Sequence, residues 1–264
     1  MFTLVAGTGY LGRRVLDRLD DGTGLNRPEV DFDTVESLPV AVPARYTVLY
    51  TVPPGGPRDE RLQRFTAALP HAPARFVYIS TTGVYGDCRG EVVTEESPVN
   101  PDSPMSVPRV AAETFLLNWA ADNDCGLVIL RGPGIYGPGR LGLERLAAGG
   151  AVLRNDEAYP GNRIHVDDLV TCCLAALSED APAAIYNVGD GNHLSSTWFA
   201  DEVARQAGLP APRKISRAQA AREFSPMRLA FMSSSRIVDT TKMREVLGVE
   251  PTYPDPADGI RASL

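Results

Sequence analysis

The sequence is poor in cysteine and lacks the spacings in which cysteine holds a structure together. Its 264 residues contain only Cys88, Cys125, Cys172 and Cys173, with no Cys-x-x-Cys pair and no cysteine/histidine ligand pattern. This excludes a disulfide framework and a zinc finger, and we expect no bound metal. Because Cys172 and Cys173 are neighbours within an apolar helical pattern, we interpret them as small core residues.

Clusters of basic residues and long apolar runs are missing as well. The net charge is −7, and the 26 lysines and arginines form no stripe, which argues against a nucleic-acid partner. No run approaches the ~20 apolar residues of a membrane span. The first seven residues contain no basic leader. We therefore expect a cytoplasmic protein that binds neither nucleic acid nor membrane.

Short apolar strands alternate with amphipathic helices along much of the chain. The pattern predicts strands over 2–6, 22–25, 46–52, 75–80, 127–130 and 185–188, and helices over 10–19, 59–69, 109–121, 167–177, 196–207 and 241–247. Such alternation is typical of α/β proteins with a parallel sheet covered by helices on both faces.

The first predicted strand runs directly into a glycine-rich turn. Gly7, Gly9 and Gly12 form a G-x-G-x-x-G pattern between this strand and the first predicted helix, which is the context that a dinucleotide-binding turn requires. Gly7 makes the tight turn, Gly9 admits a pyrophosphate close to the backbone, and Gly12 lets the helix pack on the strand. Thr8, Tyr10 and Leu11 complete the predicted cofactor-binding residues of this turn. An empty glycine loop is the alternative.

The end of the second predicted strand is where the adenosine ribose of a dinucleotide would lie. Asn26 and Arg27 occupy this point, where an acidic residue would bind the ribose diol. Because an arginine can pair with a 2′-phosphate, we expect NADP, with NAD as a possibility and an exposed loop arginine as the alternative. Residues 28–45 barely hold a helix and a strand, so the adenine wall looks reduced, and residues 30–33 are what remains of it.

Four further segments carry a resemblance to a known family. They read FVYISTTGVYG (76–86), RGPGIYGPG (131–139), RIHVDDL (163–169) and IYNVG (185–189). With the glycine turn, they make the chain similar to the extended short-chain dehydrogenase/reductases, which include NAD(P)-dependent sugar epimerases and dehydratases. The resemblance implies a Rossmann-type doubly wound sheet in residues 1–139. Residues 140–264 then hold the last sheet elements and a small C-terminal substrate lobe, within one structural unit.

The resemblance also places the family's catalytic residues. The hydroxyl position falls on Thr81, but the Tyr-x-x-x-Lys pair falls on Met105 and Arg109. A thioether has no proton to give, and an arginine cannot exchange protons near neutral pH. Pro108 predicts that the helix starts near it, which leaves Met105 outside the helix. The chain therefore resembles an atypical branch, in which Arg109 can still bind the nicotinamide ribose.

The remaining site residues follow from the same resemblance. We expect further cofactor contacts at Thr51, Val52, Pro53, Ser80 and Pro133, and substrate contacts at Thr82, Gly134 and Arg163. Tyr136 is our candidate for a substitute proton donor, although Tyr136 and Tyr85 are more typical of packed aromatics. Arg140 either meets an anionic substrate or is a solvated surface residue. We interpret His165 as structural, with Asp167 capping the next helix.

Two functions remain open. The first is an oxidoreductase or isomerase of the epimerase/dehydratase type, acting on a small or sugar-nucleotide-like substrate with a non-standard proton donor. The second is a catalytically inactive regulatory protein that senses NADP(H), which Met105 favours. We also expect a homodimer built from the helices at 59–69 and 109–121.

Overall fold

Six short runs of buried residues form one parallel sheet at the centre of the protein. The protein is described by a computed structural model that covers the backbone of residues 1–264 and every side chain except those of Met227, Ala230, Phe231 and Ser233. The strands lie in the order β2-β1-β3-β4-β6-β10. Their bounds are Gly22–Leu25, Thr3–Ala6, Thr47–Tyr50, Arg75–Thr81, Gly126–Gly132 and Ile185–Asn187. The expected α/β class with a doubly wound parallel sheet is confirmed.

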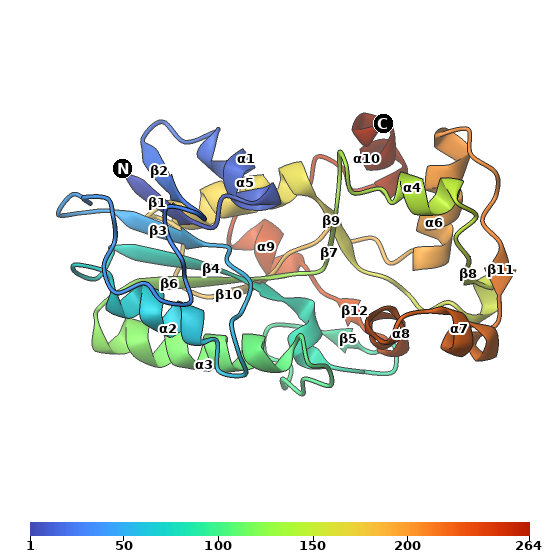
Figure 1. Cartoon of the computed structure of the whole chain (residues 1–264), viewed down its shortest axis with the longest axis horizontal. Helices are drawn as coiled ribbons and strands as arrows, with labels where there is room; N and C mark the ends of the chain where they lie inside the picture. The colour runs from blue at the N-terminus through green and yellow to red at the C-terminus, as the bar shows by residue number, and fades with distance from the viewer.

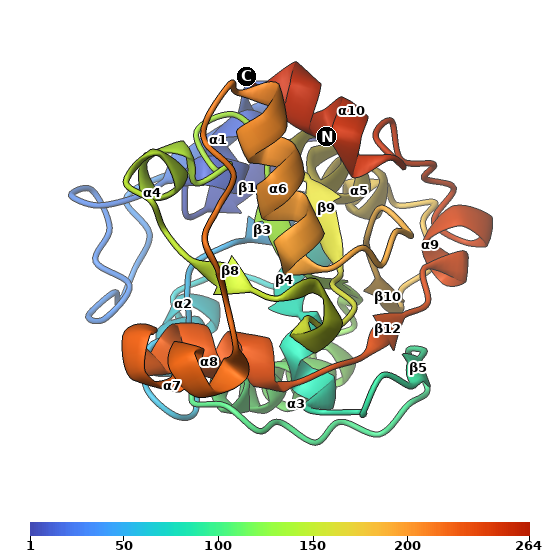
Figure 2. The ribbon, with the colours of Figure 1, turned by 90° about the vertical axis from the view of Figure 1, so that its right-hand side faces the viewer.

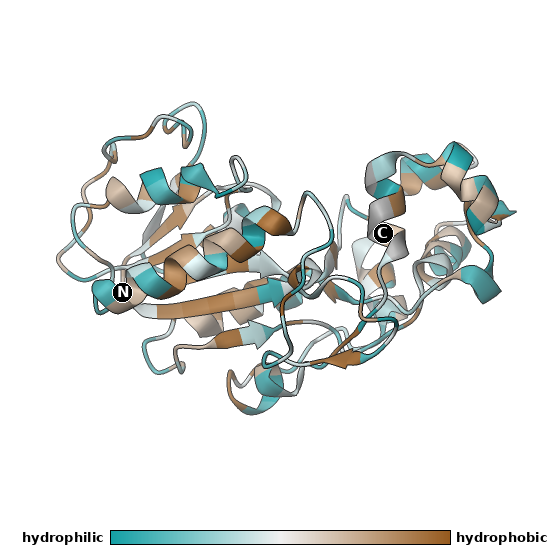
Figure 3. Cartoon of the chain, turned by 90° about the horizontal axis from the view of Figure 1, so that it is seen from below, coloured by the Kyte–Doolittle hydropathy of each residue, from teal (hydrophilic) through white to brown (hydrophobic). Residues whose placement is uncertain are grey.

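Helices cover both faces of this sheet (Figure 1). One face carries α1 (Tyr10–Leu16), α5 (Val166–Leu177) and the short α9 (Thr241–Glu245), whose apolar residues form one core cluster with the strands. The other face carries α2 (Glu60–Ala67) and α3 (Val107–Asp122), which pack on a second cluster. Apolar residues are therefore concentrated in the strands and on the helix sides turned toward them (Figure 3).

The strand order reverses at β1. The chain passes from β1 outward to β2, and then crosses back to pair β3 with the other side of β1, so that Ala6 lies between Leu25 and Tyr50. In open α/β sheets, ligands bind outside the carboxyl ends of the strands at such a reversal. The described backbone between Asn26 and Arg45 contains turns and bends but no helix or strand, in line with the reduced adenine wall that the short segment predicted.

The second half of the chain returns to the sheet and also builds a lobe at its end (Figure 2). The lobe contains α4 (Leu143–Ala147), α6 (Ser196–Gln206), α7 (Arg217–Glu223), α8 (Pro226–Ser233) and α10 (Pro256–Ser263), with β8 (Val152–Leu153) paired to β11 (Lys214–Ile215). Two small ladders join it to the sheet domain: β7 (Gly134–Tyr136) with β9 (Arg163–His165), and β5 (Val92–Val93) with β12 (Ile237–Val238). The 3-10 helices η1 (Thr82–Tyr85) and η2 (Asn155–Glu157) complete the fold.

The cap of α5 differs from the prediction. Asp167 lies inside the first turn, and His165 is the capping residue, because its Nδ1 accepts a hydrogen bond from the backbone N–H of Asp167 at 3.2 Å. Asp167 instead pairs with Arg18 at 3.3 Å. Burial lowers the pKa of His165, which keeps its ring neutral and able to accept this bond. The expected structural role of His165 agrees with this placement.

Candidate functional site

A cleft of about 430 Å³ opens at the carboxyl ends of the strands where their order reverses. Its walls come from the segments that follow β1, β2 and β3, from α2, β4 and the start of α3, and from β7 and the loop after it. The residues that line it are Gly7, Gly9, Tyr10, Leu11, Asn26, Arg27, Phe32, Thr51, Val52, Pro53, Arg61, Ile79, Arg109, Ile135 and Arg140. Ten of the predicted cofactor residues are among them, so the structure brings most of that set together.

The glycine turn has one crowded side and one open side. Gly7 has a φ of +90°, and a Cβ there would lie 2.8 Å from the Thr51 hydroxyl, which itself donates a hydrogen bond to the Gly7 carbonyl at 2.6 Å. A Cβ at Gly12 would lie 2.0 Å from that same carbonyl, so only glycine permits this approach of helix and strand. A Cβ at Gly9 would meet nothing within 4 Å. The turn is thus tight inside and leaves room beside Gly9 in the cleft.

Two arginines and two aspartates meet at the end of the cleft that follows β2. Arg27 pairs with Asp31 at 2.8 Å and with Asp33 at 2.6 Å. Arg61 donates two hydrogen bonds to the same Asp33 carboxylate, at 2.6 and 2.9 Å. The hydrogen bonds from Arg61, followed by its charge and that of Arg27, lower the pKa of Asp33. Sequence reasoning missed Arg61, because it lies in α2, far along the chain from the strand end where the ribose was expected.

The remnant of the adenine wall is apolar. Phe32 is buried and lines the cleft, with its ring edge-on to Tyr50 and tilted on Phe65, at centroid distances of 6.3 and 6.0 Å. Val30 belongs to the same cluster. Phe32 therefore lies between the cleft and the aromatic side chains of β3 and α2.

Arg109 lines the end of the cleft opposite to Arg27 and Asp33. One of its Nη atoms donates to the Tyr78 hydroxyl at 2.9 Å and to the Ile79 carbonyl at 2.8 Å. The helix α3 begins at Val107, close to the start that Pro108 predicted, and Met105 lies before it with 55% of its surface exposed. An exposed thioether therefore lies at the position that the resemblance assigned to the catalytic tyrosine, while a cation stands at the lysine position.

A buried polar network ties α3 to the sheet. The Glu113 carboxylate accepts from Ser80 and receives the guanidinium of Arg131, and both charged side chains are 5% exposed or less. Arg131 also donates to the Tyr85 hydroxyl at 2.9 Å, and Tyr85 donates to the Asn187 amide oxygen at 2.7 Å. Ser80 is thus occupied inside the protein and does not line the cleft, unlike the expectation for it. Tyr85 is a packed aromatic with its hydroxyl satisfied.

The candidate hydroxyl groups differ in access. Thr81 lies at the end of β4, and its side-chain oxygen accepts from the Gly83 N–H at 3.1 Å, which caps η1, while Thr82 is buried. Tyr136 is 3% exposed, and its hydroxyl packs against Gly259 of α10 with no hydrogen-bond partner among the described side chains. Burial raises the pKa of Tyr136. Tyr136 does not line the cleft, so this conformation does not bring it together with Arg109.

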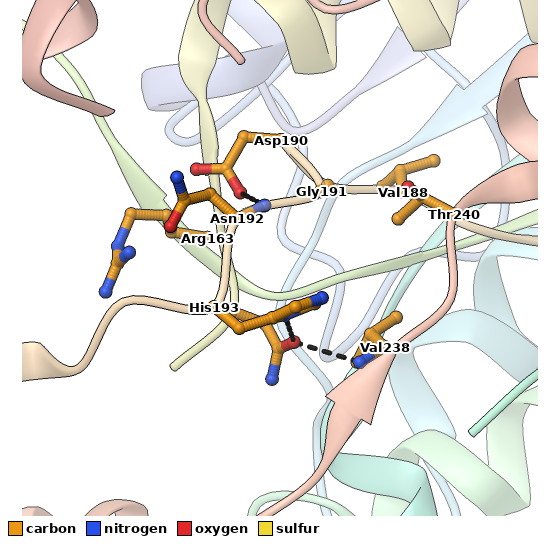
Figure 4. Close-up of a pocket in the computed structure, with 10 residues that line it drawn as sticks. Arg163, Val188, Asp190, Gly191, Asn192, His193, Val238 and Thr240 are labelled. Carbon is orange, nitrogen blue, oxygen red and sulfur yellow. Dashed lines mark hydrogen bonds between the residues drawn. The ribbon is translucent and has the colours of Figure 1, made fainter. Parts of the chain in front are cut away.

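Arg163 lies in the lobe interface and not in the cleft. It is 7% exposed, its Nη2 donates to the carbonyls of Leu194 and Ser195, and its guanidinium stacks on Phe199. Beside it and Asp190 is a cavity of about 10 Å³, room for roughly one water molecule (Figure 4). Burial raises the pKa of Asp190 to about 7. Of the other residues expected at the site, Gly134 is on β7 and Pro133 approaches Gly189.

Within the described residues, no three histidine, cysteine, aspartate or glutamate side chains come close enough together to hold a metal ion. The described helices also include none with the length and apolar character needed to cross a bilayer.

Comparison with known proteins agrees with this geometry. The model of the NAD dependent epimerase/dehydratase family matches residues 62–189. Protein YeeZ of Escherichia coli is 28% identical over 226 residues, which cover 84% of this chain and 73% of YeeZ. A conserved protein of unknown function from Silicibacter pomeroyi has 27% identity and a TM-score of 0.77, over 99% of this chain and 97% of that one.

A human protein extends the likeness in fold. The human epimerase family protein SDR39U1, solved with NADPH, has a TM-score of 0.77 at 16% identity, over 100% of this chain and 99% of that chain. The parallel sheet, the glycine turn at its strand reversal and the matched segment together make the chain similar to the NAD dependent epimerase/dehydratase family.

Proposed function

We propose that the cleft binds a nicotinamide dinucleotide, with NADP(H) preferred to NAD(H). The observation that carries this proposal is the open face of Gly9 in a cleft that has arginines at both ends. The residues present fit such a ligand: the glycine turn for the diphosphate, Phe32 for the adenine, Arg27 and Arg61 for the 2′-phosphate, and Arg109 for the nicotinamide ribose.

We propose further that the protein is an oxidoreductase or isomerase on a small or sugar-nucleotide-like substrate. When bound, the cofactor supplies hydride transfer. The chain's own part is to orient the reacting carbon beside Thr81 and Arg109, and to shield it from water with the lobe of residues 140–264. The proton must come from a group other than the side chain at position 105, because a thioether cannot donate one.

Tyr136 is the predicted proton donor, and substitution of its phenol tests this assignment. If its phenol donates the proton, Tyr136→Phe should lose roughly 10²–10⁴-fold in turnover. Its buried hydroxyl would become accessible only if α10, which carries Gly259, moved away from it before reaction. Full turnover in Tyr136→Phe would exclude this assignment and leave a bound water beside Thr81 as the donor to be examined.

A second function is favoured by the same residues. Met105 is exposed, and Arg109 already donates hydrogen bonds to Tyr78 and Ile79, an arrangement that fits a protein that binds NADP(H) without turning a substrate over. Calorimetry with NADPH and NADH tests binding, and a panel of nucleotide sugars and small carbonyl compounds, followed at 340 nm, tests turnover. Binding with no turnover across the panel would favour the sensor; no binding of either cofactor would overturn both functions.

A further inference from the structure

Arg140 lies over an aromatic ring at the mouth of the cleft. Its guanidinium carbon is 3.9 Å from the ring centroid of Tyr10, the residue that follows Gly9. Arg14 approaches the same ring at 4.1 Å, so two cations share one phenol. Of the two arginines, only Arg140 lines the cleft. This contact restrains the guanidinium of Arg140 in the protein before any ligand arrives.

The backbone that carries Arg140 is anchored to the same tyrosine. The Tyr10 hydroxyl donates to the Pro138 carbonyl at 3.0 Å, and the Arg140 N–H donates to the Gly137 carbonyl at 2.9 Å. Gly137 has a φ of +147°, and a Cβ there would come within 2.7 Å of the Tyr10 hydroxyl and of Val166. The loop from Gly137 to Arg140 can approach the start of α1 this closely only because it has glycine at that point.

The charge of Arg140 is not compensated by a neighbouring carboxylate. Within the described side chains, no carboxylate lies at ion-pair distance from it, and the residues that line the cleft include no aspartate or glutamate. Arg27 and Arg61, by contrast, already share Asp33. An anion that entered the cleft beside the open face of Gly9 would therefore meet a cation at Arg140 that Tyr10 already holds in place.

We propose that Arg140 binds the diphosphate of the dinucleotide from the loop after β7, beside Tyr10 of the glycine turn. This inference rests on the proposed function, that the cleft holds a dinucleotide. It assigns Arg140 to the cofactor, whereas the sequence pointed to an anionic substrate or to solvent. The planar guanidinium matches phosphate oxygens in a bidentate manner, and its stacking on Tyr10 reduces the entropy lost on binding.

The test compares Arg140→Gln with Arg14→Gln, which removes an equal charge from the other face of the same ring. The probes are NADPH, NADH and ADP, which share only the adenosine and the diphosphate, and affinities are measured by calorimetry at two salt concentrations. We expect Arg140→Gln to weaken all three probes by a common factor of about tenfold or more, and to reduce the salt dependence. Arg14→Gln should stay within about twofold of the wild type, as expected of a surface charge.

The outcomes separate this inference from the proposed function. If the wild-type protein binds none of the probes, the proposed function fails. If it binds them, but Arg140→Gln binds equally well, or Arg14→Gln is weakened as much, the assignment of Arg140 fails while the cofactor site stands. A loss confined to NADPH would place the contact at the 2′-phosphate and would also overturn it. Thermal melting of both variants shows that each is folded.

Discussion

Arg109 donates a hydrogen bond to the buried phenol of Tyr78 over 2.9 Å, so a residue of β4 holds this cation of the cleft in place. Burial raises the pKa of Tyr78, which keeps the phenol protonated and excludes a phenolate partner for Arg109. Tyr78 therefore positions Arg109 through a neutral hydrogen bond.

Removing this bond should loosen Arg109 without removing its charge. We predict that Tyr78→Phe lowers affinity for NADPH several-fold, in keeping with the ~0.5–1.5 kcal/mol of one such bond, and that Arg109→Gln lowers it further. Fluorescence titration of NADPH measures both. Tyr46→Phe is the matched control, because that phenol donates to the His71 carbonyl away from the cleft. Equal losses in Tyr78→Phe and Tyr46→Phe would mean a general effect on folding.

Asp33 should decide which cofactor binds more tightly. Its carboxylate occupies both Arg27 and Arg61, where a 2′-phosphate would have to compete for them. Asp33→Asn should therefore raise affinity for NADPH relative to NADH. Arg27→Gln should lower the affinity for NADPH relative to NADH by about 10-fold or more, as expected for the loss of a charge-assisted bond of ~1.5–3 kcal/mol. Calorimetry with both cofactors measures the ratio, and an unchanged ratio in both variants would remove these residues from cofactor selection.

The pair formed by Glu113 and Arg131 should be costly to break from one side. Glu113→Gln leaves Arg131 buried without a counter-charge, and we predict a loss of about 3–5 kcal/mol in the free energy of unfolding by urea. The double variant Glu113→Gln/Arg131→Leu should recover part of that loss. Asp258→Asn breaks an exposed pair with Arg261 and should cost at most about 1 kcal/mol. A double variant less stable than Glu113→Gln would contradict the explanation.

Asp190 should make stability depend on pH. Burial raises its pKa from 3.8 to about 7, so the folded protein keeps a proton that the unfolded chain releases near pH 4. Its contribution to stability is therefore greatest below pH 4 and is lost as the pH rises to about 7. Relative to the wild type, Asp190→Asn should gain stability between pH 4.5 and 8, by on the order of a few kcal/mol.

The comparison with a variant is needed because His193, whose pKa is lowered by burial, titrates with the opposite sign in part of this range. Urea denaturation at several pH values measures the difference in the free energy of unfolding between Asp190→Asn and the wild type. Asp180 is exposed, so the control variant Asp180→Asn should show no pH-dependent difference in stability from the wild type. If the difference in the free energy of unfolding between Asp190→Asn and the wild type does not change between pH 4.5 and 8, Asp190 is already ionised at the lower pH and the prediction is wrong.

We predict a homodimer through α2 and α3. Their buried residues face the sheet, but Leu117 on α3 is 49% exposed. Light scattering should give twice the 28.4 kDa of one chain, and Leu117→Glu should shift the mass to that of a monomer. Thr114→Glu, a neighbouring exposed position on α3, tests whether charge on this helix has the same effect. A monomer in the wild type at micromolar concentration would refute the prediction.

The sequence predicted the elements around the cleft because their signals are local. Apolar runs mark β1, β3, β4 and β6, and the glycine pattern directly after the first run locates the turn at the end of β1. The pair between Glu113 and Arg131 could not be predicted in the same way, because its partners lie 18 residues apart on different elements. A partial signal existed, since Glu113 shares a helix face with Ala112 and Leu116, which are buried.

Other features depend on tertiary contacts alone. The ladders of β7 with β9 and of β5 with β12 are two or three residues long, too short to show a hydrophobic period. The direction of the Tyr136 hydroxyl is set by Gly259, more than a hundred residues further along the chain. The capping of α5 by His165 went against the usual preference for aspartate at that position.

The place of β10 in the sheet has a consequence for synthesis of the chain. It pairs with β6 through Ile185–Asn187 and Ile129–Arg131, so a ribosome must release more than fifty further residues after β6 before that edge is covered. Until then, the β6 edge presents unpaired backbone groups in a strand that is buried in the finished protein, which is the kind of edge that pairs wrongly with other chains. We therefore expect nascent chains that end before residue 185 to aggregate or to recruit chaperones, and the arrival of β10 to mark the moment at which the domain becomes independent of them.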